Sequence, residues 1–146
     1  MIRLNVKNIK NVETALKRYG KDAVRDIGAV TKINAQEIEG NAKSFAPVND
    51  SFLRSGIKAE QQKTPLVWRV TAYMPYSAFM EFGTGALVDI KEGWGEMASW
   101  FKGKGIKKVN INPRPFMYPA FVIGRKQYIK DIKDSLKHLN KKFNNG

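Results

Sequence analysis

The stretch PYSAFMEFGTG, residues 75–85, holds the acidic side chain best placed to do chemistry, Glu81, directly before a Gly-Thr-Gly turn. A carboxylate beside a glycine-rich loop occurs in catalytic sites and in loops that cradle phosphate. General acid–base catalysis by paired carboxylates would need a partner for Glu81, and the candidates Asp89, Glu92 and Glu96 stand at spacings that fix no such geometry. The pattern therefore predicts no catalytic carboxylate pair.

A phosphate loop also lacks its required residues. The third glycine of a dinucleotide-binding turn would fall at Val88, and no Gly-Lys-Ser/Thr sequence occurs anywhere in the chain. The sequence also predicts no metal site and no nucleophilic catalysis, because the chain has no cysteine and His138 is its one histidine. We therefore expect no cofactor, no metal site and no enzymatic activity.

The alternative for the same stretch is a structural corner. Pro75 ends a predicted strand, and the two glycines permit a sharp exit. Glu81 would then cap a turn or pair with an arginine, for which Arg54 and Arg114 are candidates. We assign this corner role to the following residues: Tyr76, Glu81, Phe82 and Gly83.

The charge of the chain is strongly positive. Lys and Arg number 26 against 13 Asp and Glu, a formal net charge of +13, and only Asp131 and Asp134 are acidic beyond residue 101. Such a surplus favours contact with an anionic partner, whether nucleic acid, an acidic protein surface or anionic lipid, and the charge alone does not say which. A solvated helix face would show the same composition. The candidate basic residues that face DNA or a protein partner are Lys102, Lys104, Lys107, Lys108, Arg114, Lys126 and Lys130.

Hydrophobic periodicity predicts the elements that would carry these residues. Ile2, Leu4 and Val6 alternate with polar residues, which is typical of a half-buried strand. An apolar stripe at helical spacing then runs to Phe45, with a bend or break expected near Gly20. Two strands follow at about 55–62 and 66–73, and residues 76–82 could make one or two helical turns.

The second half of the chain is expected to contain an extended basic loop and a long helix. The loop covers 84–115 and includes a short amphipathic helix, and the long helix after Pro115 ends in a flexible tail at 141–146. The apolar candidates for a subunit interface are Trp94, Met97, Phe101, Phe121 and Leu136. We therefore predict a single α+β domain over 1–146, with a small antiparallel sheet packed against a long N-terminal helix and a long C-terminal helix. No apolar run approaches the ~20 residues that a membrane span needs, so we expect no membrane partner.

Three ordered stretches carry a family resemblance: AKSFAPVNDSFLRSGI at 42–57, YSAFMEFGTG at 76–85 and RPFMYPA at 114–120. Together they resemble the tailed-bacteriophage neck and tail-completion family, the head–tail joining or minor tail component proteins. The usual Thr-Gly before the leucine is Ser51-Phe52 here, and 86–112 is longer than the usual link.

The resemblance implies a non-enzymatic structural protein of the virion, assembled in the host cytoplasm. Such a protein forms a homo-oligomeric ring, of six or twelve copies, that completes the tail or the connector and joins head to tail around the DNA channel. Its partners would be connector or head-closure proteins, tail-tube or tail-terminator proteins, and packaged double-stranded DNA. The alternative is a non-enzymatic, sequence-independent nucleic-acid-binding protein that acts through its basic C-terminal half.

Overall fold

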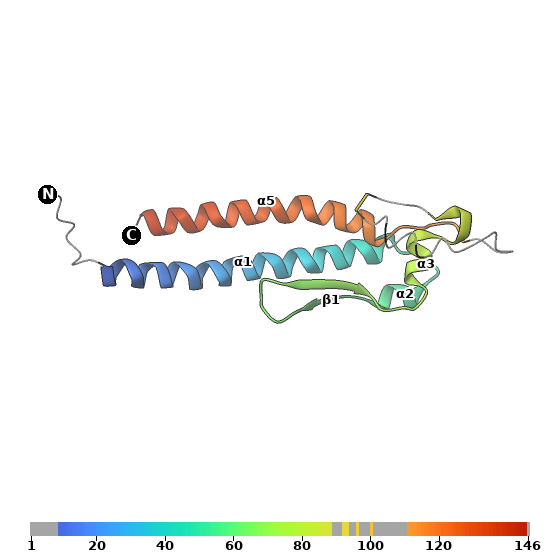
Figure 1. The fold of residues 1–146 in the computed structure, drawn as a ribbon, viewed down its shortest axis with the longest axis horizontal. Coiled ribbons are helices and arrows are strands. Elements are labelled where there is room, and N and C mark those ends of the chain that lie inside the picture. The colour runs from blue at the N-terminus through green and yellow to red at the C-terminus, as the bar shows by residue number, and fades with distance from the viewer. Residues whose placement is uncertain (1–8, 89–91, 94–95, 97–99, 101–110, 146) are drawn as a thin grey trace.

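The protein is an elongated α+β structure in which a long central helix lies between a second long helix and a β-hairpin (Figure 1). The computed structural model describes residues 9–88, 92–93, 96, 100 and 111–145. The predicted fold class is confirmed. The elements in chain order are α1 (Ile9–Phe45), α2 (Ser51–Ser55), β1 (Ile57–Gln61), β2 (Trp68–Ala72), α3 (Ser77–Phe82), the 3-10 turn η2 (Gly85–Leu87) and α5 (Met117–Asn144).

Helices α1 and α5 pack against each other in antiparallel fashion, so that α1 begins where α5 ends (Figure 1). Near that end the rings of Tyr19 and Phe143 meet edge to face with centroids 5.0 Å apart. Near the middle, Asn34 Nδ2 donates a hydrogen bond of 2.9 Å to Asp131 Oδ2. Both helices are amphipathic, and burying their apolar stripes against each other stabilises them far more than intrinsic helix propensity does.

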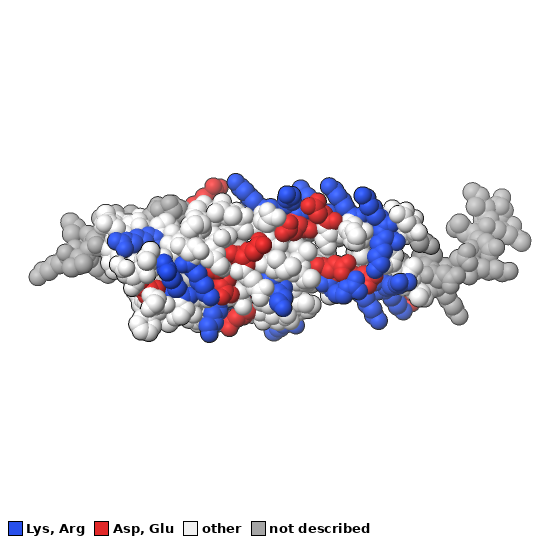
Figure 2. All heavy atoms as spheres, turned by 180° about the vertical axis from the view of Figure 1, so that it is seen from behind, with Lys and Arg blue, Asp and Glu red and all other residues white. Residues whose placement is uncertain are grey.

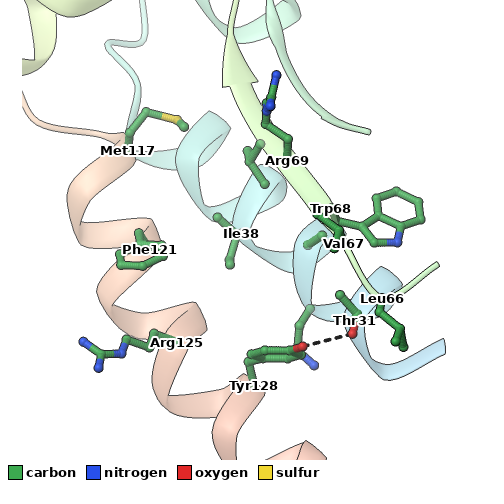
Figure 3. A pocket seen from close by; sticks show the side chains of 13 residues that line it. Thr31, Ile38, Leu66, Val67, Trp68, Arg69, Met117, Phe121, Arg125 and Tyr128 are labelled. Carbon is green, nitrogen blue, oxygen red and sulfur yellow. Dashed lines mark hydrogen bonds between the residues drawn. The ribbon is translucent and has the colours of Figure 1, made fainter. Parts of the chain in front are cut away.

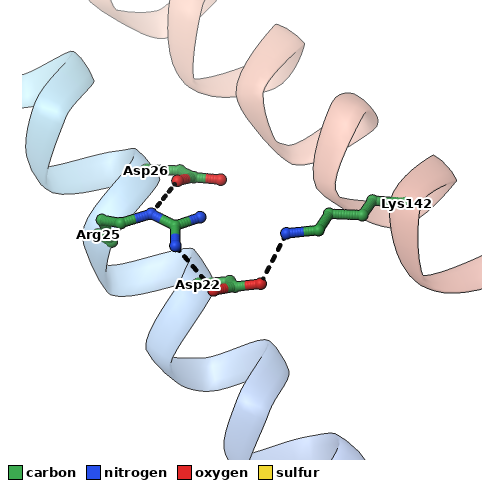
Figure 4. Close-up of polar contacts among 4 residues, drawn as sticks. All are labelled: Asp22, Arg25, Asp26 and Lys142. Carbon is green, nitrogen blue, oxygen red and sulfur yellow. Dashed lines mark hydrogen bonds and ion pairs between the residues drawn. The ribbon is translucent and has the colours of Figure 1, made fainter.

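An ionic cluster joins the two helices close to their shared end (Figure 4). Lys142 of α5 lies 2.9 Å from Asp22 Oδ2, and Arg25 lies 3.0 Å from Asp22 Oδ1 and 2.9 Å from Asp26 Oδ1. The hydrogen bond from Lys142 and the neighbouring positive charges hold the pKa of Asp22 below its ordinary value. Lys141 and Lys142 both lie in the last turn of α5, which ends at Asn144.

The break expected near Gly20 is wrong, because α1 continues without interruption from Ile9 to Phe45. A glycine costs a helix about 1 kcal/mol relative to alanine. The residues on either side of Gly20 contact α5, through the ring of Tyr19 and the carboxylate of Asp22. These tertiary contacts outweigh the local cost of the glycine.

The hairpin pairs β1 and β2 in register from Ile57↔Ala72 to Gln61↔Trp68. Both strands are shorter than the predicted 55–62 and 66–73, but the predicted alternation is present. Ile57 is fully buried, and Val70 and Ala72 pack against the same core, whereas the face that carries Lys58 and Arg69 is exposed. Side chains alternate across a strand, so the hairpin buries one face on α1.

Glu39 of α1 closes the outer edge of β1. Its Oε2 accepts a hydrogen bond of 2.7 Å from the Ala59 backbone N–H, and its Oε1 pairs with Lys43. Partial burial acts to raise the pKa of Glu39, but the hydrogen bonds from Lys43 and Ala59 outweigh it and lower the pKa below its ordinary value. A single carboxylate thus ties the sheet to the central helix.

The core lies toward the end of the molecule where α1 finishes and α5 begins. It joins residues from both long helices, from α2 and from β1, and the chain reaches it from widely separated positions. Leu53, Ile57 and Phe116 are its largest members, each with no exposed surface. The buried cluster consists of Ala42, Ala46, Leu53, Ile57, Phe116 and Ala120.

Gly124 allows α5 to pack closely on α1, and Gly124→Ala should lower the free energy of unfolding by about 1–3 kcal/mol. A Cβ at this position would lie 2.1 Å from Ile38 Cγ1 and 2.6 Å from Ile38 Cδ1, so one helix must move or Ile38 must leave its rotamer. The matched control is Gly40→Ala, because nothing lies within 4 Å of the added carbon there and the change should stabilise the helix. Urea unfolding checks both, and equal stability of Gly124→Ala and the unaltered protein would contradict this packing.

Glu39→Gln should destabilise the fold at neutral pH and much less in acid. The native pKa of Glu39 is below its ordinary value near 4.5, so its carboxylate contributes stability above that pH and loses it as the pH falls through the native pKa. We expect a loss of about 0.5–1.5 kcal/mol at pH 7, since the carboxylate is partly screened by solvent. Urea unfolding of Glu39→Gln and the unaltered protein at pH 7 and pH 3 measures this loss. A stability difference between the two proteins that is the same at both pH values would exclude the proposed role of the Glu39 carboxylate.

Candidate functional site

Glu81 lies at the end of α3 and directs its carboxylate at the first residues of α5. Its Oε2 accepts hydrogen bonds from the backbone N–H groups of Phe116, at 2.8 Å, and Met117, at 2.9 Å, and its Oε1 accepts one of 2.9 Å from Tyr118. The residue is buried, with 4% of its surface exposed. The acid that the sequence marked as the most reactive is therefore held by three main-chain donors.

This arrangement is a helix cap supplied by a distant part of the chain. The first backbone N–H groups of a helix have no partner within the helix, and a negative charge beside them is favoured by the helix dipole. Phe116, which occupies the capping position of α5, makes no side-chain hydrogen bond of its own to these donors. Glu81 takes over that role.

The residues that follow Glu81 bind the same incoming segment. Thr84 N–H donates to Ile111 O at 3.0 Å, and Ile111 N–H donates to Thr84 Oγ1 at 2.8 Å. Gly83 has a φ of 76°, and a Cβ there would lie 2.7 Å from Ile111 O, so both its backbone conformation and its surroundings require glycine. The Glu-Phe-Gly-Thr sequence thus fixes how the chain enters α5.

Tyr76 joins this corner to α2 on the other side. Its hydroxyl donates a hydrogen bond of 2.7 Å to Asp50 Oδ1, the same oxygen that caps α2 by accepting 2.8 Å from the Leu53 N–H. The hydrogen bond to the Asp50 carboxylate raises the pKa of the Tyr76 hydroxyl. Phe82 is buried next to Glu81, with 2% of its surface exposed. All four residues assigned to the corner thus lie at one junction of α2, α3 and the start of α5.

Among the described residues, neither arginine considered as a partner of Glu81 forms an ion pair with it. Arg54 Nη2 donates to Ala46 O at 3.3 Å, and the Arg114 backbone N–H donates to Met80 O at 2.7 Å. Glu81 was expected either to cap a turn or to pair with an arginine, and in the described residues it acts as a cap. The capped element is α5 rather than the turn next to Glu81 in sequence.

The structure describes only some of the basic residues expected to face DNA or a protein partner. Lys102, Lys104, Lys107 and Lys108 lie outside the described residues. Arg114, Lys126 and Lys130 are exposed, and the two lysines stand one helical turn apart on α5. On the face drawn in Figure 2, Lys and Arg side chains gather toward the end where α1 begins and α5 finishes, with Asp and Glu among them.

The apolar interface candidates divide in the same way. Trp94, Met97 and Phe101 lie outside the described residues. Phe121 is 45% exposed on α5, whereas Leu136 is partly buried. Phe121 is therefore the described candidate whose surface is available to another molecule.

An apolar groove of about 600 Å³, which we did not predict from the sequence, lies between α5 and β2 with α1 as its floor (Figure 3). The residues that line it come from positions far apart in the chain, so periodicity within one element could not reveal it. The one signal in the sequence was the apolar character of Phe121 and of the alternating residues of the second strand. Its apolar lining includes Ala35, Ile38, Val67, Val70, Met117 and Phe121.

Among the residues that the structure describes, no three His, Asp or Glu side chains gather in a way that could hold a metal ion. Over the same residues, no helix combines the length and the apolar character needed to cross a membrane.

Comparison with known proteins relates the chain to a bacteriophage family. A family model described as "Bacteriophage HK97-gp10, putative tail-component" matches residues 10–83, which is half of the chain. The matched region ends at Gly83, so it includes α1, the hairpin and Glu81 but not the helix that Glu81 caps. No curated protein and no solved structure matches the chain.

Glu81→Gln should lower the free energy of unfolding by about 1.5–3 kcal/mol, since hydrogen bonds to a charged group are each of that order. The amide keeps one acceptor, loses the charge that favours the helix N-terminus, and turns an N–H₂ group toward backbone donors. The control is Glu37→Gln on the exposed surface of α1, which should change stability by less than about 0.5 kcal/mol. If urea unfolding gives the two variants the same stability, Glu81 does not hold α5.

Proposed function

The chain belongs to the HK97-gp10-like family of bacteriophage tail components, and from this premise we propose that it forms part of the neck ring that joins head to tail. As a tail component it is a structural protein of the virion in contact with other virion proteins. In the proposed role it completes the tail or the connector around the channel that DNA crosses. Assembly would take place in the host cytoplasm.

The family match is the observation that carries the proposal, and the state of Glu81 supports its non-enzymatic part. The acid in the most site-like stretch of the sequence has both carboxylate oxygens engaged by backbone N–H groups and is almost fully buried. A catalytic acid or base must reach the proton that it transfers. The stretch around Glu81 therefore serves to build a rigid scaffold, as a structural ring protein requires.

Two separate apolar surfaces support assembly into a ring. One is the groove between α5 and β2. The other is the turn that joins α1 to α2, where Phe45, Val48 and Phe52 are 43%, 79% and 73% exposed. A subunit with two different contact surfaces can make head-to-tail contacts, and these close into rings when the rotation permits. We propose a ring of six or twelve copies.

The lysines of α5 support the proximity of DNA. Lys126, Lys130, Lys133, Lys137 and Lys141 recur at steps of three and four residues and are all exposed. The residues of α5 that contact α1, such as Tyr128 and Asp131, lie on the opposite side of the helix. Such a stripe would face the phosphates of packaged double-stranded DNA. Connector or head-closure proteins and tail-tube or tail-terminator proteins would meet the ends of the ring.

Phage particles made without this chain should accumulate as DNA-filled heads and separate tails. The physical reason is that the surfaces bridged by the ring remain uncovered when the ring is missing. Electron microscopy of lysates from a phage with a nonsense codon in this gene measures the fraction of joined particles, and supplying the chain from a plasmid should restore it. Normal joined particles in its absence would overturn the proposal and favour the alternative of a free nucleic-acid-binding protein.

A further inference from the structure

The two outer edges of the β-hairpin differ in what lies beside them. On β1 the outer edge is occupied by Glu39, which accepts the Ala59 N–H. On β2 the outer edge borders the apolar groove, since residues 66–70 line that groove and no residue of β1 does. An edge strand whose backbone groups are left uncovered is a template for another strand.

The hydrogen-bond pattern identifies the backbone groups on this open edge. Gln62 N–H donates to Val67 O and Tyr73 N–H donates to Gly56 O, both at 2.9 Å, so residues 67 and 73 face β1. Residues of an antiparallel pair alternate in direction, so Trp68, Val70 and Ala72 direct their N–H and C=O groups away from β1. Ala72 O accepts a hydrogen bond from Ser77 Oγ. Within the described residues, no hydrogen bond to the outward groups of Trp68 and Val70 is found.

The groove beside this edge suits the side chains of an added strand. Val67 at its rim is 53% exposed, and Phe121 across from it is 45% exposed. Asn34, which also lines the groove, is 2% exposed, and its Oδ1 is a buried acceptor without a hydrogen-bond partner. The site thus offers apolar surface and unused hydrogen-bonding groups side by side, which is the combination used in recognition by strand addition.

We propose that this edge of β2 accepts residues 2–7 of a second copy of the chain as a third strand. That segment reads Ile-Arg-Leu-Asn-Val-Lys, with apolar residues at alternate positions. A strand of this pattern buries one face, so Ile2, Leu4 and Val6 would enter the groove while the polar residues face solvent. The occupant is therefore a half-buried strand that the sequence contains.

The length of the connection places this contact between copies and not within one chain. A fully extended segment from Ile2 to Ile9 spans at most about 25 Å. Helix α1 rises about 33 Å between Ile9 and Thr31, and Thr31 is the first residue of α1 that lines the groove. The segment therefore cannot lie along β2 of its own chain. The contact is head-to-tail, and this inference rests on the ring proposed above.

A pair of charge variants on the same segment tests the contact. Leu4→Asp places a carboxylate in the groove, and Asn5→Asp places the same charge on the opposite, solvent-facing side. Urea unfolding of both variants checks that each keeps the stability of the unaltered chain. In sedimentation of the full chain, Leu4→Asp should weaken self-association roughly tenfold or more, because it removes a buried leucine, whereas Asn5→Asp should leave it within about twofold. Equal association of both variants and the unaltered chain would overturn the inference and leave the neck proposal standing.

Crosslinking tests the geometry directly, because the chain has no cysteine of its own. A tagged chain carrying Leu4→Cys is mixed with an untagged chain carrying Val67→Cys and treated with a short bis-maleimide. We expect crosslinks between the tagged and untagged chains, and few with Glu37→Cys, an exposed position on α1 outside the groove. A double variant carrying both Leu4→Cys and Val67→Cys gives a second check, because crosslinks formed only within one chain would overturn the inference. A full chain that stays monomeric at every concentration would also overturn it. Neither result would decide the neck proposal, which the joining of particles tests separately.

Discussion

The fold depends on one buried carboxylate that holds the start of a distant helix. Glu81 supplies acceptors to three backbone N–H groups of α5, while Gly83 and Thr84 fix the segment that leads into it. Without this cap, buried main-chain donors would lack partners beside Phe116, at a cost of about 1–3 kcal/mol for each group. The position and direction of α5 therefore follow from a short motif that lies before it in the chain.

The rest of the molecule follows from the direction that this cap gives to α5. From its capped end, α5 runs back along α1, with Gly124 against Ile38 at one point and Lys142 beside Asp22 at the far end. The hairpin covers another side of α1 and is tied to it through Glu39. Because α5 and the hairpin both pack on the same helix without closing over it, they leave the apolar groove between them. The same packing that builds the scaffold thus leaves surfaces for assembly.

The sequence predicted what depends on local pattern. Periodicity identified the two long helices and the hairpin, and the turn residues at Pro75 and Gly83 marked the corner. It failed at Gly20, because the contacts of Tyr19 and Asp22 with α5 decide the course of the helix there. It left the partner of Glu81 open because Phe116, Met117 and Tyr118 are remote in the chain, and the groove was missed for the same reason. Interactions between distant segments depend on topology, which a single sequence does not fix.

The most direct test of the account is a cryo-electron microscopy reconstruction of the neck of the virion. We predict a closed ring of this chain at the junction of head and tail, with the lysine face of α5 toward the DNA channel. We also predict a third strand on the outer edge of β2, contributed by the neighbouring subunit. A neck whose density is fully explained by other proteins, with this chain elsewhere or missing from the particle, would contradict it.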